Sequence, residues 1–377
     1  MFKNTNSEDN LLVEEVTRML DAALDVSSAS VTHSYKVIVN LKREYLDIVF
    51  SVPVPFLINQ ELNSQILQIL TPSLAGRLTI FPNRGPEIVV INGSPAMRFH
   101  FKKGVFRRLT FDTLDDVHAR NGVIPLMESY NFSTSGLANA IWSGQSGLGK
   151  STAMLTAISA LVNGVDELNR PISEDEKPQI TVIDPKMDLQ LHNFCERKKL
   201  GYISPADSDN LNVFLSAVKD TLGQEMDEIR KRQRNLIQTG RKSKKLYLVV
   251  IDEAMSISSM FASQGSKQLK EYLSMLDMIM LQARSANCAV WISSQVITAS
   301  GSAPVLSSSA RSQANLKVLF SPFPTRSQTQ YLFNDVDLEG ITVPHGNYLK
   351  GIGIASMQPL NLVVPFQSPI IRGLRNG

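Results

Sequence analysis

The pattern of apolar and polar positions divides the chain into two parts that meet near residue 120. In the first part, apolar residues recur at helical spacing over 11–24 and 59–70. Short stretches of alternating polarity predict strands at 35–41, 45–52, 77–81, 87–91 and 97–101. We therefore expect a small α+β domain over residues 11–118, preceded by a polar, flexible N-terminus at 1–10.

Beyond this point, short apolar segments alternate with longer segments of helical spacing. The expected strands are 138–142, 179–183, 246–251, 289–293 and 316–320. The expected helices between them are 150–162, 211–238 and 266–286. Two stretches rich in Ser, Gly and Pro are expected to be loops, at 262–266 and 298–309. This alternation is the βαβ signature of a mostly parallel sheet, so residues 119–377 are predicted to form an α/β domain.

A glycine-rich segment lies between the first strand and the first helix of this second part, and it fits the pattern G-x-x-x-x-G-K-[ST]. Glycines let successive backbone N–H groups turn toward a phosphate chain, and the following helix directs its positive end at the same place. Lys150 can bridge the terminal phosphate oxygens, and the Ser151 hydroxyl can ligate Mg²⁺. The residues expected to bind the nucleotide are Gly144, Gln145, Ser146, Gly147, Leu148, Gly149, Lys150, Ser151 and Thr152.

Polar side chains follow three of the expected strands. Asp252 and Glu253 end one apolar strand, where Asp252 can hold Mg²⁺ and Glu253 can polarise the water that attacks the nucleotide. Asp184 ends an earlier strand, and it is either a surface turn former or part of the ligand-binding edge of a parallel sheet. Gln295 follows a later strand, and it either contacts the γ-phosphate or is a plain strand-end residue.

The order of these motifs resembles that of the FtsK/HerA family of hexameric DNA-pumping ATPases, including FtsK/SpoIIIE translocases and conjugative coupling proteins. The resemblance covers about residues 120–355. The matching segments are Ile124-Pro-Leu, Asp184-Pro185-Lys186, Arg232-Gln-Arg234, Ile251-Asp252-Glu253-Ala254, Leu281-Gln-Ala-Arg284-Ser-Ala, Ser293-Ser-Gln295, Asn315-Leu-Lys317-Val-Leu-Phe and Thr325-Arg326-Ser. The chain departs from the family in two places. Lys317 stands where an arginine is usual, and Val296-Ile297 stands where Arg-Pro usually follows the glutamine.

The resemblance implies a RecA-like P-loop motor domain with a mostly parallel sheet, preceded by the small α+β domain. It also implies an ATPase that uses ATP and Mg²⁺ to move DNA without sequence preference, as a homo-oligomeric ring of six subunits. Lys150, Glu253 and Gln295 would act in hydrolysis, and Arg284 and Arg326 are the candidates for an arginine supplied by the neighbouring subunit. The compact chain suits a plasmid or conjugative mobile element. The alternatives are replication initiation, DNA packaging and protein secretion.

Because the net charge of the chain is close to zero, DNA binding would require a local patch of basic residues. The 377 residues include 38 Lys and Arg against 35 Asp and Glu, a net charge of +3. Residues 230–245 contain eight basic side chains and no acidic one. Four of them are the expected DNA contacts: Arg241, Lys242, Lys244 and Lys245. The other four are Arg230, Lys231, Arg232 and Arg234. Such a run is also typical of a solvated face or of a contact with a neighbouring subunit, and these alternatives stay open.

The cysteines and the hydropathy indicate a compartment. Cys195 and Cys288 are too few for a disulfide framework, and we expect both to be buried small residues in a reducing cytoplasm. No segment approaches the ~18–20 consecutive apolar residues of a membrane helix, and the polar start lacks the apolar core of a signal peptide. We therefore expect no intrinsic membrane segment, so that any membrane attachment would come from a membrane or relaxosome partner.

Overall fold

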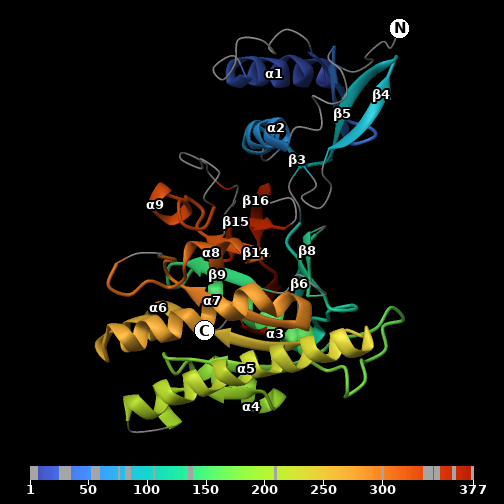
Figure 1. Ribbon diagram of the computed structural model, residues 1–377. Helices are drawn as coiled ribbons and strands as arrows, with labels where there is room; N and C mark the ends of the chain where they lie inside the picture. The colour runs from blue at the N-terminus through green and yellow to red at the C-terminus, as the bar shows by residue number, and fades with distance from the viewer. Residues whose placement is uncertain are drawn as a thin grey trace. The chain divides into compact units, whose positions relative to one another are not determined.

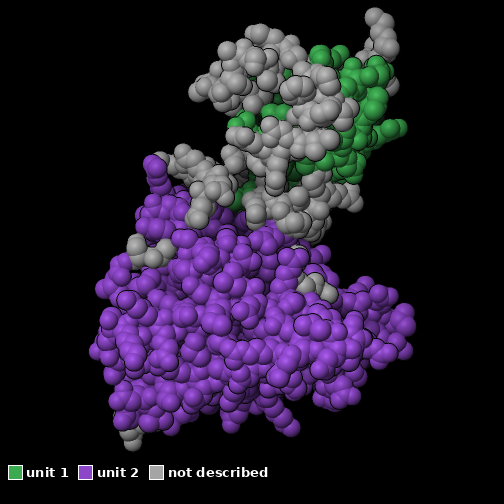
Figure 2. Space-filling model, in the orientation of Figure 1, with its two compact units in different colours: residues 1–107, 360–365 green, residues 108–359, 366–377 purple. Residues whose placement is uncertain are grey.

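The computed structural model describes most of the chain, in two compact units. The described residues are 7–24, 35–51, 60–74, 77–80, 86–104, 107–128, 130–134, 139–207, 210–298, 301–333, 343, 349–358 and 362–374. Residues 1–6 and parts of expected elements at positions 52, 59, 81, 138 and 299–300 lie outside them. Figure 2 colours the two units separately: unit 1 comprises residues 1–107 and 360–365, and unit 2 comprises residues 108–359 and 366–377.

The division between the units falls after Arg107, whereas the sequence suggests a boundary at His118. Residues 108–118 belong to unit 2 because a short 3₁₀ helix, Leu114–Asp116, is tied to helix α3 (Lys150–Val162). The carbonyl oxygen of Leu114 accepts hydrogen bonds from Ser159 Oγ at 2.7 Å and Asn163 Nδ2 at 3.2 Å. The spacing of apolar residues along the chain does not reveal hydrogen bonds to a helix that comes much later in the sequence.

Unit 1 is an antiparallel sheet with two helices, as its alternating polarity predicts. The strands are β1 (Tyr35–Asn40), β2 (Tyr45–Phe50), β3 (Leu78–Ile80), β4 (Glu87–Ile91) and β5 (Ser94–Lys103). β5 is central, because β2, β3 and β4 all pair with it. The helices are α1 (Ser7–Leu24) and α2 (Gln60–Ser73). α1 begins earlier than expected, and Glu8 and Asp9 in its first turn suit the positive end of a helix.

Unit 2 is built on one large, mostly parallel sheet, which confirms the predicted α/β class (Figure 1). In spatial order its strands are β11 (Gly201–Ile203), β10 (Gln179–Ile183), β12 (Tyr247–Ile251), β13 (Cys288–Ser294), β9 (Ala140–Gly144), β14 (Leu316–Phe320) and β15 (Ile352–Met357). The sheet ends with β16 (Leu362–Gln367), of which only residues 366–367 are counted with unit 2. The strands from β11 to β14 run parallel, and β15 is antiparallel to β14. Every residue of β9, β12 and β13 is buried, and the sequences of these strands are therefore mainly apolar, with serines or glycine only at the ends of β9 and β13.

Helices connect these strands along the chain. Besides α3, they are α4 (Leu189–Lys198), α5 (Leu211–Thr239), α6 (Ala254–Ser263), α7 (Ser266–Ala286), α8 (Ser308–Ser312) and α9 (Arg326–Thr329). α5 and α7 lie side by side, joined by an ion pair of Lys219 and Glu271 at 2.6 Å (Figure 1). α3 and α7 have the bounds expected from the sequence. The loop expected at 262–266 is shorter because α6 extends to Ser263, and α8 occupies the end of the one expected at 298–309.

Smaller elements complete unit 2. They are the hairpin β7 (Val123–Met127) and β8 (Tyr130–Ser133), the pair β6 (Thr110–Phe111) and β17 (Ile370–Ile371), and 3₁₀ turns at Pro205–Asp207 and Arg372–Leu374. Cys195 and Cys288 are both buried and free, as expected, and burial raises the pKa of each thiol to about 12. Over the described ranges, none of the helices has the length and apolar character to cross a membrane.

The parallel strands end together at one edge of the sheet. Ile183 of β10, Ile251 of β12 and Ile292 of β13 are consecutive register partners, so that β10 and β12 end at one level and β13 continues to Ser294 on the same side. We call this side the carboxyl edge and the side where the strands begin the amino edge. The glycine-rich loop after β9 also starts at the carboxyl edge, because β9 is parallel to β13. The fold therefore gathers there the motifs that the sequence singled out.

Candidate nucleotide-binding site

The glycine-rich loop connects β9 to α3 through backbone conformations that favour glycine. Gly144, Gly147 and Gly149 have φ angles of 151°, 81° and 93°. A Cβ at Gly144 would lie 2.7 Å from the Cβ of Phe320, and a Cβ at Gly149 would lie 2.8 Å from the backbone nitrogen of Gly351. Both space and backbone conformation therefore require glycine at these two positions. α3 begins at Lys150, so the unpaired N–H groups of its first turn border the loop.

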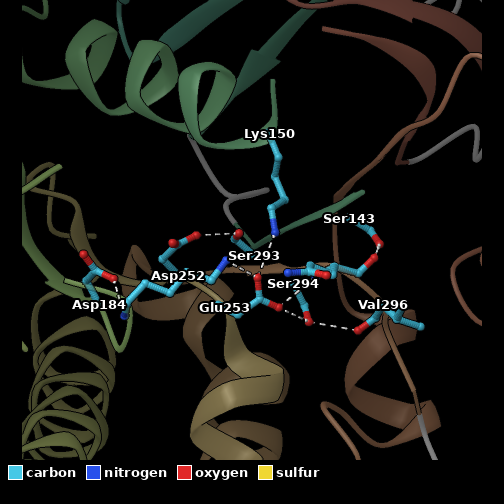
Figure 3. A network of polar contacts seen from close by, with 10 residues as sticks. Ser143, Lys150, Asp184, Asp252, Glu253, Ser293, Ser294 and Val296 are labelled. Carbon is cyan, nitrogen blue, oxygen red and sulfur yellow. Dashed lines mark hydrogen bonds and ion pairs between the residues drawn. The ribbon is translucent and has the colours of Figure 1, made fainter. Parts of the chain in front are cut away.

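Lys150 extends from the start of α3 to the carboxyl edge. Its side chain is only 5% exposed, and its Nζ lies 3.3 Å from Glu253 Oε2 (Figure 3). Burial lowers the pKa of this lysine, although the nearby carboxylates oppose that shift. The loop lysine therefore points at the carboxylates that follow β12.

Asp252 is the first of these carboxylates and is almost completely buried. Its Oδ1 accepts a hydrogen bond from Ser293 Oγ at 2.7 Å, and Ser293 belongs to the adjacent strand β13. Burial raises the pKa of Asp252 despite that hydrogen bond and the charge of Lys150. A bound cation would favour the charged form of this carboxylate.

Glu253 is held on both of its carboxylate oxygens. Oε2 accepts from Lys150 and, at 2.5 Å, from Lys186 Nζ, while Oε1 accepts from the backbone N–H of Gln295 at 2.9 Å. Burial raises the pKa of Glu253, but these hydrogen bonds and positive charges outweigh it and lower the pKa overall. Its backbone has a φ of 48°, in the left-handed region, immediately before α6 begins.

Asp184 is a buried loop organiser, which corrects the interpretation of this residue as a surface turn former. Its carboxylate accepts from the backbone N–H groups of Lys186 at 2.8 Å and Asp188 at 2.7 Å, and from the Tyr202 hydroxyl at 2.8 Å. These bonds shape the turn after β10 and place Lys186 beside Glu253. The sequence motif Asp184-Pro185-Lys186 marked this turn but did not reveal the lysine's partner.

Gln295 takes part in the site through its main chain. Its N–H binds Glu253, and its carbonyl oxygen accepts from Ser143 Oγ at 3.4 Å. Its side chain is exposed, so contact with a γ-phosphate stays a prediction. Ser151 is also exposed, in the first turn of α3, and Thr152 is half-buried.

The oxygen donors expected for Mg²⁺ fit that ion chemically. Asp252 supplies a carboxylate and Ser151 a hydroxyl, both hard oxygen ligands. Mg²⁺ commonly takes one or two such groups together with substrate phosphates and water, rather than a cage of protein ligands. No group of three His, Cys, Asp or Glu side chains suited to a metal gathers in the described part of the chain.

The two candidate arginines lie at opposite edges of the sheet. Arg326 is the first residue of α9, which follows the carboxyl end of β14, and its side chain is exposed. Arg284 is in the last turn of α7, just before β13 begins, and is exposed at the amino edge. Neither is among the described contacts of Lys150, Asp252 or Glu253. Both therefore stay candidates only for a contribution to another subunit's site.

The basic run 230–245 lies at the amino edge, where it leads into β12. Arg232 is largely buried, and its guanidinium donates to the carbonyl oxygens of Lys245 at 2.6 Å and Asn287 at 3.1 Å. Lys242 Nζ donates to the carbonyl oxygen of Arg284 at 2.9 Å, and Lys244 pairs with Glu176 at 2.8 Å. Part of the run therefore stabilises the fold. Arg232 in particular connects, by hydrogen bonds, the segments that lead into β12 and β13.

Comparisons with known proteins identify a shared fold. No family model and no curated protein matches the sequence. The solved structure of the pCW3 conjugation coupling protein TcpA, in a monomer form with ATPγS, is 14% identical with a TM-score of 0.50, over 95% of this chain and 94% of that chain. The likeness to TcpA is one of fold, over nearly the full length of both chains.

Two further solved structures are similar over part of their length. EssC (ATPases 2 and 3) from Geobacillus thermodenitrificans is 12% identical with a TM-score of 0.46, over 73% of this chain and 49% of that chain. The cytoplasmic domain of the Thermomonospora curvata type VII secretion ATPase EccC is 14% identical with a TM-score of 0.47, over 73% and 33%. The sheet order of unit 2 and the glycine-rich loop between β9 and α3 define an α/β fold of the P-loop type.

Proposed function

We propose that this protein is an ATPase that couples Mg²⁺-dependent ATP hydrolysis to sequence-independent movement of DNA. The observation that carries the proposal is the convergence of Lys150, Asp252 and Glu253 beside the glycine-rich loop, at the carboxyl edge of the parallel sheet. A lysine, a carboxylate for the metal and a second carboxylate for water are the groups that nucleoside triphosphate hydrolysis needs.

The residues divide the reaction between them. The loop N–H groups and the start of α3 hold the phosphates, and Lys150 turns from Glu253 to the terminal phosphate oxygens. Mg²⁺, when bound by Asp252 and Ser151, supplies charge neutralisation on the phosphates. Glu253 accepts a proton from a water whose oxygen bonds to the terminal phosphorus while the bond to the departing ADP oxygen breaks. The N–H of Gln295 orients Glu253 for this step.

The proposed active form is a ring, with six subunits, in which a neighbour completes each ATP site. Charge develops on the transferring phosphoryl group, and an arginine from outside the site can stabilise it. Arg284 and Arg326 are both exposed and can face another copy of the chain. The similarity in fold to a conjugation coupling protein supports a role in plasmid or conjugative DNA transfer.

DNA binding is proposed for Arg241, Lys242, Lys244 and Lys245. Lysine and arginine contacts to phosphates give a grip that is independent of sequence, which a moving motor requires. Protein secretion is the alternative substrate class for a motor of this fold, and the experiment below separates the two.

The test measures ATP turnover by the purified chain with and without duplex DNA, together with displacement of a triplex-forming strand from duplexes of several sequences. We expect DNA to stimulate turnover and the triplex strand to be displaced on every sequence. The Lys150→Ala variant is the matched control that should do neither. ATP turnover that ignores both duplex and single-stranded DNA would exclude the DNA motor and favour a protein substrate.

A further inference from the structure

Both carboxylate oxygens of Glu253 have hydrogen-bond partners in this structure, and Oε2 is held by two cations. Its Oε2 receives two ammonium groups, Lys150 at 3.3 Å and Lys186 at 2.5 Å. Its Oε1 receives the Gln295 N–H at 2.9 Å. The Ser294 hydroxyl lies 3.3 Å from the same oxygen, but its single proton has a nearer acceptor, the Val296 carbonyl oxygen at 2.9 Å. A general base must offer a lone pair to water, and at Oε2 each of the two ammonium groups competes with water for one.

Departure of Lys150 alone leaves one cation on that oxygen. In the proposed function Lys150 turns to the phosphates, which removes the longer of the two ion pairs and leaves the shorter one in place. Lys186 is the remaining cation, and its side chain is 39% exposed whereas Lys150 is 5% exposed. An exposed ammonium can exchange its partner for water or for an anionic ligand at small cost.

The turn that carries Lys186 is fixed even though its side chain is exposed. Asp184, fully buried, binds the N–H groups of Lys186 and Asp188 and the Tyr202 hydroxyl, all within 2.8 Å. Met187 has a φ of 59°, a left-handed conformation that few non-glycine residues adopt. The backbone therefore holds its position, and the flexible lysine side chain is the part that can move between Glu253 and another partner.

From this geometry we infer that Lys186 is a positioning residue that restrains Glu253. In this role Lys186 sets the rate of ATP hydrolysis in the absence of DNA. This rests on the proposed ATPase function and adds a regulating residue to it. While Lys186 holds Oε2, Glu253 is fixed but occupied. When Lys186 turns away, the Gln295 N–H still orients the carboxylate and Oε2 is free for water.

The test compares ATP turnover, without DNA, by the full chain and two variants at Lys186. Lys186→Met keeps the side-chain length and removes the charge, whereas Lys186→Arg keeps the charge. We expect Lys186→Met to raise kcat about 2- to 10-fold, the scale of releasing a partly exposed ion pair, with KM for ATP within about twofold. Lys186→Arg should restore the slow rate. Lys270→Ala, at an exposed lysine on α7, is the matched control and should behave as wild type.

Each other outcome contradicts either the role of Lys186 alone or the proposed ATPase function as well. If Lys186→Met leaves kcat unchanged or lowers it, in a chain that Lys150→Ala inactivates, the restraint is wrong and the ATPase proposal stands. If Lys186→Arg is as fast as Lys186→Met, charge is not what restrains Glu253, and the inference also fails. A wild-type chain with no ATP turnover overturns the proposed function and this inference together.

Discussion

The two edges of the large sheet in unit 2 carry the same kinds of charged side chain and arrange them in opposite ways. At the carboxyl edge, Lys150, Asp252 and Glu253 are each less than 10% exposed and converge on one another from different elements. At the amino edge, the run 230–245 holds eight basic side chains, most of them exposed and bound to local acids or carbonyl oxygens.

The difference separates a built site from a charged surface. Burying a charge costs free energy unless it is paired, so the buried cluster at the carboxyl edge is held by specific partners and strained backbone. Exposed ion pairs such as Lys244 with Glu176 contribute little to stability, and the lysine can exchange its partner for another anion at small cost. The variants described next change residues at one edge or the other, so that the effects of the two edges can be compared.

The largest expected effect comes from the two arginines, one at each edge. One of the two arginines is expected to complete the ATP site of the neighbouring subunit. Replacing that residue, by Arg326→Ala or Arg284→Ala, should reduce the rate of ATP hydrolysis about 10³–10⁵-fold. Mixing that variant with Lys150→Ala subunits should restore turnover, because one copy supplies the intact loop and the other the intact arginine. If Arg284 is the residue that complements, the amino edge of one subunit serves the carboxyl edge of the next.

The control for the mixing experiment is assembly itself, measured by light scattering. If rings form and neither arginine variant complements, the site is not shared between subunits.

Glu253→Gln should reduce turnover about 10²–10⁴-fold while ATP binding persists, because the amide can be positioned but cannot take a proton from water. Glu271→Gln is the matched control, since Glu271 pairs with Lys219 at the surface and should leave turnover unchanged. Calorimetric titration with ATPγS and a phosphate-release assay measure the two quantities separately. A Glu253→Gln variant that also loses ATP binding would contradict this division of roles.

Neutralising Arg241, Lys242, Lys244 and Lys245 should weaken DNA binding evenly across sequences and flatten its salt dependence. The log–log salt slope should fall by roughly one for each DNA phosphate that is no longer neutralised. Fluorescence anisotropy over a range of salt concentrations checks this, with a Lys267→Ala and Lys270→Ala pair on α7 as the control. If the slope does not change, the amino edge is a solvated surface with no role in DNA binding.

The smallest effect concerns the buried carboxyl group of Glu225 on α5. This residue is fully buried, and no donor in the described residues reaches either carboxylate oxygen. Burial raises its pKa well above the usual value, so the folded chain holds a proton that the unfolded chain releases above its own pKa near 4.5. Stability contributed by the protonated form is therefore lost as pH rises, by up to about 1.4 kcal/mol per pH unit.

Glu225→Gln should remove that part of the pH dependence, and Glu225→Leu should stabilise the fold by about 1–3 kcal/mol at pH 7. Urea unfolding at pH 5 and pH 7 measures both. A wild-type chain whose stability rises relative to Glu225→Gln between these two values would contradict the assignment.

The glycine-rich loop and the elements around it could be predicted closely from the sequence. α3, α7, β10 and β14 have the expected bounds, because continuous apolar runs and a glycine-rich turn identify buried strands and the helix start. α4 could not be predicted, since it buries only Leu191, Phe194 and Cys195 in an otherwise polar segment. β15 and β16 are also absent from the expected strands, because Gly353 and Pro365 interrupt apolar segments of strand length.

The partners of Glu253 depend on which strands are neighbours. Lys186 is 67 residues away in the chain and meets Glu253 only because β10 and β12 are adjacent in the sheet. Similarly, the position of the basic run at the amino edge follows from strand direction, which residue composition does not contain. The sequence motifs therefore predict the chemistry of the site, whereas the order of strands in the sheet determines which charged side chains are in contact.

The most direct test of the two-edge account is ATP binding and hydrolysis by three forms of the chain. They are wild type, Lys150→Ala, and the variant neutralised at Arg241, Lys242, Lys244 and Lys245. Without DNA, the account predicts that Lys150→Ala loses both binding and turnover while the neutralised variant keeps both. If Lys150→Ala retains ATP binding and turnover, the carboxyl edge is not the nucleotide site and the account is wrong.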